Sequence, residues 1–244
     1  MLTLVLAGTA TALATGLGAV PVFLLGRRAE ALRPTLWGLA AGVMAVASVA
    51  GLLLPALDEG SVGEVAAGLA TGILFLVVSR GVVDRSELAS GNGRGVGARA
   101  SVLVFAVLLV HSIPEGFAIG TAYASDTEGL ALFVILAIAI QNIPEGTSVA
   151  IPLEAAGASS SRQFWAAVAT SAPQPIGAVL AYLLVEQVEA LLPFSFAFAA
   201  GAMLALVVAE LLPDAVADGG WLSASAGFMV GAVMMLAAST ALNV

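Results

Sequence analysis

The stretch "VHSIPEGFAIG" (110–120) holds the only histidine of the chain, within an apolar run. A proline follows His111 by three residues and a glutamate follows it by four. The stretch "IQNIPEGTSVA" (140–150) repeats this pattern with glutamine in place of the histidine. Two near-copies of one polar, proline-bearing hexapeptide in separate apolar segments require a common explanation.

The composition indicates an all-α integral membrane protein. Hydrophobic residues make up 60% of the 244 residues, charged residues only 10%, and the mean hydropathy is +1.07. So few polar side chains cannot cover a water-soluble surface of this size. Apolar runs of about 20 residues, enough to cross a bilayer as a helix, recur along the chain. They are continuous rather than alternating in period two, which argues against a β-barrel.

The apolar runs predict eight transmembrane helices in a single domain, 1–244. The predicted spans are roughly 2–25, 36–57, 63–83, 101–123, 129–153, 164–187, 194–213 and 222–242. The longest connection, 84–100, is rich in Gly, Ser, Asn and Arg and is expected to be a cytoplasmic linker. The chain contains no cysteine, so disulfides and thiolate ligands are excluded.

Basic residues fall on one side of this topology. All eight are arginines, and each lies in or flanks an odd-numbered connection between spans: Arg27, Arg28, Arg33, Arg80, Arg85, Arg94, Arg99 and Arg162. The connections after spans two, four and six carry only acidic residues. The positive-inside bias therefore predicts that the odd connections are cytoplasmic and that both termini are extracellular.

His111, Glu115 and Glu145 lie deep inside predicted spans four and five. An ionised side chain at mid-membrane costs at least about 2.5–3.5 kcal/mol, so such residues are expected to face the bundle interior and to mark a pathway. His111 and Glu115 are four residues apart, as are Gln141 and Glu145, so each pair shares a helix face. The two spans run in opposite directions, which lets the two hexapeptides meet near mid-depth.

The proline and glycine of each hexapeptide predict local features of the helices. Pro114 and Pro144 cannot donate a backbone hydrogen bond and are expected to interrupt their helices. Gly116 and Gly146 are expected to let a neighbouring helix approach closely.

Two carboxylates, an imidazole, one or two amide oxygens and a water match a four- to six-coordinate site for a divalent cation. Zn²⁺ suits imidazole and carboxylate best, and Cd²⁺, Fe²⁺, Mn²⁺ and Co²⁺ are also compatible. Adjacent carboxylates should not both stay ionised without the ion, so metal binding should release protons. A proton relay, a cation channel without a dedicated metal centre, and a pair of proline kinks with interhelical hydrogen bonds are the alternatives.

These motifs resemble the ZIP (Zrt/Irt-like) family of divalent metal transporters, particularly its GufA-like prokaryotic branch. "HSIPEG" and "QNIPEG" are similar to the family's signatures in helices four and five. Three further segments look like its second, sixth and seventh helices: "GVMAVASVAGLLLPALDEG" (42–60), "QPIGAVLAYLL" (174–184) and "GAMLALVVAELLPDA" (201–215). The resemblance implies eight helices, both termini outside, alternating access and a homodimer.

The resemblance also implies a binuclear metal centre. One ion would be held by His111, Glu115, Gln141 and Glu145. A second would use Ser112, Asn142 and Gln174, with both glutamates bridging. Ser112 and Gln174 depart from the family's usual Asn and Glu, so the second site is expected to be weak or empty. Glu210 resembles the family's glutamate in helix seven and is expected to be an exit-side ligand or an interfacial residue.

The expected function is transport of divalent transition-metal cations, with zinc first, toward the cytoplasm across a prokaryotic cell membrane. The expected partners are the metal ions, the bilayer and a second copy of the chain, with no nucleic acid; the metal is cargo rather than a cofactor. A membrane metal sensor would need an output domain. An intramembrane hydrolase would ordinarily show an HExxH helix or a Ser/His pair, and a pump a nucleotide loop, so an enzyme is not expected.

Overall fold

The structure is a computed structural model that describes residues 1–85 and 96–244, with the backbone alone at Arg27, Asp84 and 96–104. This part of the chain is almost wholly helical and contains no strand, which confirms the all-α class. The elements are α1 (Leu2–Leu17), α2 (Ala19–Leu25), η1 (Gly26–Leu32), α3 (Arg33–Ser48), η2 (Val49–Leu53), α4 (Leu54–Glu59), α5 (Val62–Arg85), α7 (Val96–Ala124), α8 (Leu130–Ala155), α9 (Ser160–Thr170), α10 (Pro173–Gln187), η3 (Glu189–Leu191), α11 (Leu192–Leu206), η4 (Val207–Leu211) and α12 (Leu212–Leu242).

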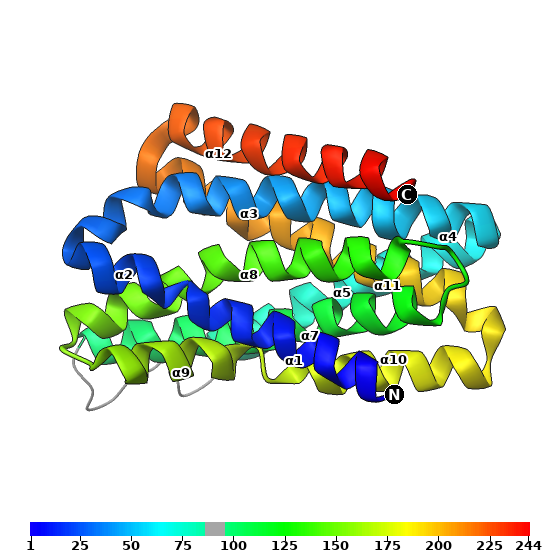
Figure 1. The fold of residues 1–244 in the computed structure, drawn as a ribbon, viewed down its shortest axis with the longest axis horizontal. Helices are drawn as coiled ribbons and strands as arrows, with labels where there is room; N and C mark the ends of the chain where they lie inside the picture. Colours follow the sequence, from blue (N-terminus) through cyan, green and yellow to red (C-terminus); the bar gives the residue numbers. More distant parts are fainter. Residues whose placement is uncertain (86–95) are drawn as a thin grey trace.

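Seven helical stretches of the described residues are long and apolar enough to cross a membrane. The first six correspond to the first six predicted spans. The seventh, Glu189–Leu242, contains both of the last two predicted spans in 54 residues. A straight helix of that length would extend about 80 Å, far more than a hydrocarbon core of about 30 Å. The chain instead leaves the helical conformation at Gly220 and turns back beside α3 (Figure 1).

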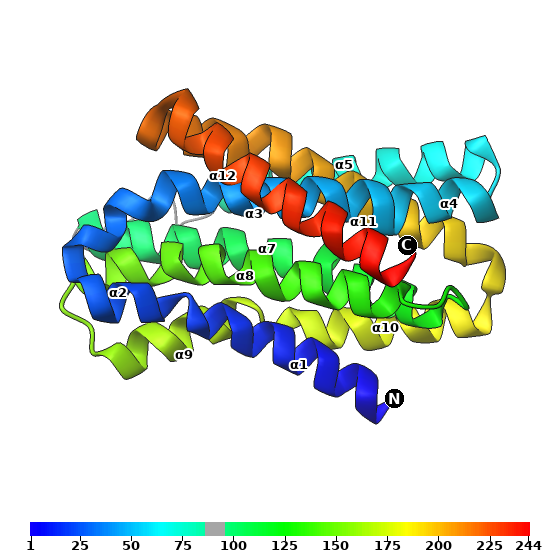
Figure 2. The same cartoon turned by 45° about the horizontal axis from the view of Figure 1, so that its top comes forward.

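Helix α8 lies at the centre of the bundle, in contact with α1, α3, α7 and α9. Figures 1 and 2 show α3 and α12 on one side of α8, and α1, α9 and α10 on the other. Large apolar side chains such as Leu74, Leu180 and Met229 are exposed on the outer helices. The buried interior holds His111, Glu115 and other polar side chains. An apolar exterior around a polar interior is what a bilayer requires, because lipid cannot solvate polar groups.

The connections fall at two opposite ends of the bundle. Figure 1 shows both termini toward the end that holds the α4–α5 and α7–α8 turns, whereas the α2–α3 and α8–α9 connections lie at the other end. The predicted linker 84–100 joins the C-terminal end of α5 to the N-terminal end of α7. Its edges are helical, because α5 runs to Arg85 and α7 begins at Val96, and its middle lies outside the described residues.

The predicted interruption at the prolines is wrong. Helices α7 and α8 continue through Pro114 and Pro144. The irregular turns occur on other helices: η2 and η4 are π-helical, and each is followed by a Leu-Pro pair at the start of the next α-helix. The π turn η4 carries Glu210, which gives it a direct role in placing a candidate site residue.

Close packing of α3 against α12 gives a stability prediction. A Cβ atom at Gly42 would overlap the Phe228 carbonyl oxygen and lie 2.9 Å from the Ala232 nitrogen, whereas nothing lies within 4 Å of one at Gly81. We expect Gly42→Ala to lower the stability of the detergent-solubilised protein by about 1–3 kcal/mol through overpacking. Gly81→Ala, the matched helical control, should leave the thermal unfolding midpoint unchanged or slightly higher. Equal midpoints for the two variants would show that this helix contact is not tight.

Candidate metal centre

Four helical elements supply the predicted site residues. Helix α7 carries His111, Ser112 and Glu115, α8 carries Gln141, Asn142 and Glu145, α10 carries Gln174, and η4 carries Glu210. All except Glu210 are buried, although the surrounding helices are largely apolar. The side chain of Glu210 is 11% exposed. The two hexapeptides do meet, because Gln141 Nε2 donates to Glu115 Oε1 at 2.7 Å.

The glycine after each glutamate sets how closely the neighbouring helices approach. A Cβ atom at Gly116 would lie 2.9 Å from the Cα atom of Gln174, and one at Gly146 would overlap the carbonyl oxygen of Thr15. Helix α10 therefore packs directly against α7, and α1 directly against α8. The predicted close approach at these two glycines is confirmed, and it brings Gln174 and helix α1 to the polar centre.

Glu115 is the acceptor around which the centre is arranged. Its Oε1 atom accepts from Gln141 Nε2 at 2.7 Å, and its Oε2 atom accepts from Gln174 Nε2 at 2.6 Å. Hydrogen bonds this short are typical of a charged partner. The Glu145 carboxyl group is adjacent to that of Glu115. Two acidic side chains from two helices thus lie together in the buried interior.

Two oxygen atoms in the centre lack hydrogen-bond partners. They are Gln141 Oε1 and Glu145 Oε1, and both are buried. Leaving a buried acceptor unpaired costs about 1–3 kcal/mol, so such atoms need a physical reason. Both are acceptors, and amide and carboxylate oxygens are ligands for divalent cations. The residues present therefore fit a cation at the predicted first metal position.

The residues expected to hold a second ion are fully engaged with the protein. Ser112 donates toward the carbonyl oxygens of Leu108 at 3.1 Å and Thr170 at 2.9 Å. Asn142 Nδ2 donates to the Thr11 carbonyl oxygen at 2.8 Å, and Gln174 Oε1 accepts from Thr11 Oγ1 at 2.8 Å. The two predicted metal positions therefore differ in how their polar atoms are satisfied.

His111 and Glu210 form a neighbouring group. His111 Nε2 lies 3.7 Å from Glu210 Oε1, and Glu210 Oε2 pairs with Arg80 Nη1 at 2.5 Å. Among the described residues, no three or more His, Asp or Glu side chains are gathered closely enough to hold a metal ion. The predicted first ligand set is thus brought into one region, with His111 turned toward Glu210, and Glu210 faces the protein interior.

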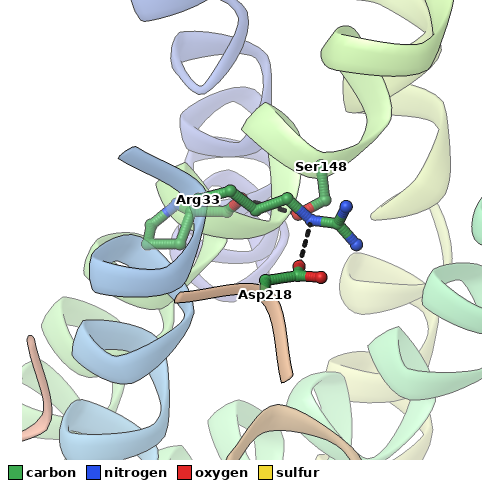
Figure 3. Close-up of polar contacts among 4 residues, drawn as sticks. Arg33, Ser148 and Asp218 are labelled. Atoms are coloured by element: carbon green, nitrogen blue, oxygen red, sulfur yellow. Dashed lines mark hydrogen bonds and ion pairs between the residues drawn. The ribbon is translucent and has the colours of Figure 1, made fainter. Parts of the chain in front are cut away.

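A cavity of about 230 Å³ connects the centre with the arginine-bearing end of the bundle. His111, Glu145 and Ser148 line it, and so do Arg33 and Arg80. Figure 3 shows the Arg33 side chain passing beside Ser148 toward Asp218. Arg33 Nε lies 3.2 Å from Asp218 Oδ2, an ion pair without hydrogen-bond geometry.

A second cavity, of about 470 Å³, lies at the opposite end of the bundle. Its lining includes four acidic residues, Glu59, Asp126, Glu186 and Glu189. The charged residues of this lining are all acidic, whereas the 230 Å³ cavity is lined by both arginines and acidic residues.

Sequence reasoning missed three residues that make polar contacts in or near the centre: Thr11, Thr15 and Arg80. Thr11 contacts Gln174 and Asn142, and the hydroxyl group of Thr15 lies 2.6 Å from that of Ser171. Their spacing of four residues in the first span was the available signal, because it places two buried hydroxyl groups on one helix face. Arg80, which was predicted to flank the connection between spans three and four, lies within α5 and reaches Glu210.

These observations define a class: a helical membrane protein with two glutamates, a histidine and several amides gathered in a buried, oxygen-rich centre. Within that class, the chain belongs to the ZIP zinc transporter family, because the family model described as ZIP Zinc transporter matches residues 84–239. The family predicted from the two hexapeptides is confirmed.

Known relatives agree with this assignment. The chain is 36% identical to zinc transporter GufA of Myxococcus xanthus, over 95% of this chain and 94% of that protein. It is 34% identical to zinc transporter ZIPB of Bordetella bronchiseptica, over 98% of this chain and 81% of that protein. It is also 38% identical to a putative zinc transporter of Arabidopsis thaliana, over 84% of this chain but only 33% of the longer plant protein.

Access to the cavity can be measured with single cysteines, because the natural chain has none. We expect Ser148→Cys to react with a membrane-impermeant methanethiosulfonate added from the side opposite the termini, since Ser148 lines the cavity. Thr121→Cys, at a fully buried position on the same helix as His111, serves as the control and should stay unlabelled. Labelling of Ser148→Cys only from the side of the termini would contradict this description of the cavity.

Proposed function

We propose that this protein carries divalent transition-metal cations, zinc first, across the membrane toward the cytoplasm through the centre between α7 and α8. The observation that carries the proposal is the pair of buried, unpartnered oxygens, Gln141 Oε1 and Glu145 Oε1, beside the Glu115 carboxylate. A cation bound there would supply the missing partner for both oxygens. Its charge would be offset by the two glutamates, which lowers the cost of placing a divalent ion inside a bilayer.

The names of the relatives support zinc as the first substrate. GufA and ZIPB are each called a zinc transporter, and each aligns with nearly the whole of this chain. The ligand types agree with zinc and also with cadmium, iron, manganese and cobalt, because imidazole and carboxylate serve all of these ions.

The orientation follows from the arginines. Arginine-rich connections favour the cytoplasmic side, so the end with the 230 Å³ cavity faces the cytoplasm and both termini lie outside a prokaryotic cell membrane. We further propose eight crossings, with the Glu189–Leu242 stretch crossing twice. Both termini lie toward one end of the bundle, as an even number requires, and Gly220 provides the reversal (Figure 1).

The two cavities supply a route. The acidic residues of the outer cavity, Glu59, Asp126, Glu186 and Glu189, would raise the local concentration of cations. The inner cavity leads from Glu145 past Glu210 and Asp214 toward the cytoplasmic end. A cation at the centre would therefore leave toward the cytoplasm from this conformation. Alternating access and a homodimer complete the proposal, and their support is the resemblance to the family.

A proton relay or a metal-free channel explains the centre less well. A relay needs a continuous chain of groups that both donate and accept, whereas Gln141 Oε1 is an amide oxygen that only accepts. The relatives' names describe transport and not catalysis, so we propose no enzymatic reaction or sensor role.

Metal flux tests the proposed function. We expect Glu145→Gln to lower the initial rate of Zn²⁺ entry into proteoliposomes by at least about tenfold, because the variant removes a charged ligand from a buried site. A Zn²⁺-sensitive dye trapped in the vesicles measures this rate. Glu128→Gln, which removes a carboxylate from the exposed α7–α8 turn, should transport like the wild type. Wild-type flux in the Glu145 variant, or none in the wild type, would refute the assignment.

A further inference from the structure

The amide of Gln174 takes part in four hydrogen bonds inside the centre. Its Nε2 atom donates to Glu115 Oε2 at 2.6 Å and to Asn142 Oδ1 at 3.3 Å. Its Oε1 atom accepts from Thr11 Oγ1 at 2.8 Å and from Asn142 Nδ2 at 3.2 Å. Thr11, Asn142 and Gln174 are all fully buried. Every donor and acceptor of this amide is therefore used within the protein.

The chemistry of the partners fixes which way the two amides point. The Thr11 carbonyl oxygen can only accept, so the group of Asn142 that faces it at 2.8 Å must be the Nδ2 amino group. An ionised Glu115 carboxylate also only accepts, so Gln174 must present Nε2 to it. The carbonyl oxygen of Gln174 is thereby directed to the Thr11 hydroxyl group, whose single hydrogen is shared between this oxygen at 2.8 Å and the Gly8 carbonyl oxygen at 2.9 Å.

This orientation removes Gln174 as a metal ligand. A carboxamide binds a cation through its oxygen, and Gln174 Oε1 is occupied by Thr11 Oγ1 and Asn142 Nδ2. The amino group points at Glu115, where it would repel a cation on the Oε2 side of that carboxylate. Gln141 Oε1 and Glu145 Oε1, in contrast, remain open.

We propose that Thr11 is a positioning residue that holds Gln174 as a hydrogen-bond donor to Glu115 and so limits the centre to one divalent cation. The inference rests on the proposed function. Helix α1 approaches the centre because Gly146 admits its backbone at Thr15, one turn from Thr11. The first helix thereby decides how many ions the facing helices hold, although it contributes no carboxylate.

The test is the number of Cd²⁺ ions bound per chain by the purified full-length protein, measured by titration calorimetry and counted by ¹¹³Cd NMR. The wild type and Thr11→Ser, which keeps the hydroxyl group, should bind one ion and show one resonance. Thr11→Val keeps the volume but removes the donor, which frees Gln174 Oε1 to turn toward Glu115. A second ion and a second resonance should then appear at saturating Cd²⁺.

Further variants keep the result interpretable. Thr11→Ala also lacks the hydroxyl group and adds no volume, so it must reproduce the second ion if Thr11→Val does not fold. Gln174→Glu should bind a second ion by itself, because it supplies a carboxylate in place of the amide. In a Gln174→Leu background, Thr11→Val should change neither the number of ions nor the affinity, because Thr11 then has no amide to hold.

The outcomes separate this inference from the proposed function. One ion in the wild type and still one in both hydroxyl-free variants would overturn the role of Thr11 alone. Two ions in the wild type would overturn the one-ion limit. A wild type that binds no Cd²⁺ or Zn²⁺ and shows no flux would overturn the proposed function, and this inference with it.

Discussion

A carboxylate inside a bilayer has no water to solvate it, and this constraint organises the packing of the bundle. Glu115 meets it with two short hydrogen bonds from the amides of Gln141 and Gln174. Those amides come from different helices, so α8 and α10 must both pack closely on α7. Gly116 permits the contact with α10 by leaving no side chain between the backbones. The apolar exterior then surrounds this core of polar contacts.

The two sides of the polar centre differ in how many of their polar atoms have hydrogen-bond partners. Its α10 side, with Asn142 and Gln174, is saturated by hydrogen bonds that include Thr11 of α1. Its other side leaves Gln141 Oε1 and Glu145 Oε1 without partners. One side is therefore held together by hydrogen bonds within the protein, and the other presents two oxygens that can serve as cation ligands. The inner cavity begins at Glu145, on the unsaturated side.

Much of this arrangement follows from local sequence patterns. Apolar length predicts the spans, and the spacing of four residues places His111 with Glu115 and Gln141 with Glu145 on single helix faces. The partners that lie far apart in the sequence could not be predicted in this way. The contact of Thr11 with Gln174 depends on how α1 crosses the bundle, and that of Arg80 with Glu210 depends on the packing of α5 beside η4. The predicted interruption at Pro114 and Pro144 was wrong for a similar reason. A missing backbone donor does not by itself end a helix that is packed among neighbouring helices.

The central claim is that one cation lies between the open oxygens of Gln141 and Glu145, and anomalous scattering locates such an ion directly. Crystals grown with Zn²⁺ should show a strong anomalous peak about 2.0–2.2 Å from Gln141 Oε1 and Glu145 Oε1, with Glu115 beside it. A peak confined to the outer acidic cavity, or to Glu210 and Asp214, with those two oxygens still unoccupied, would contradict the account.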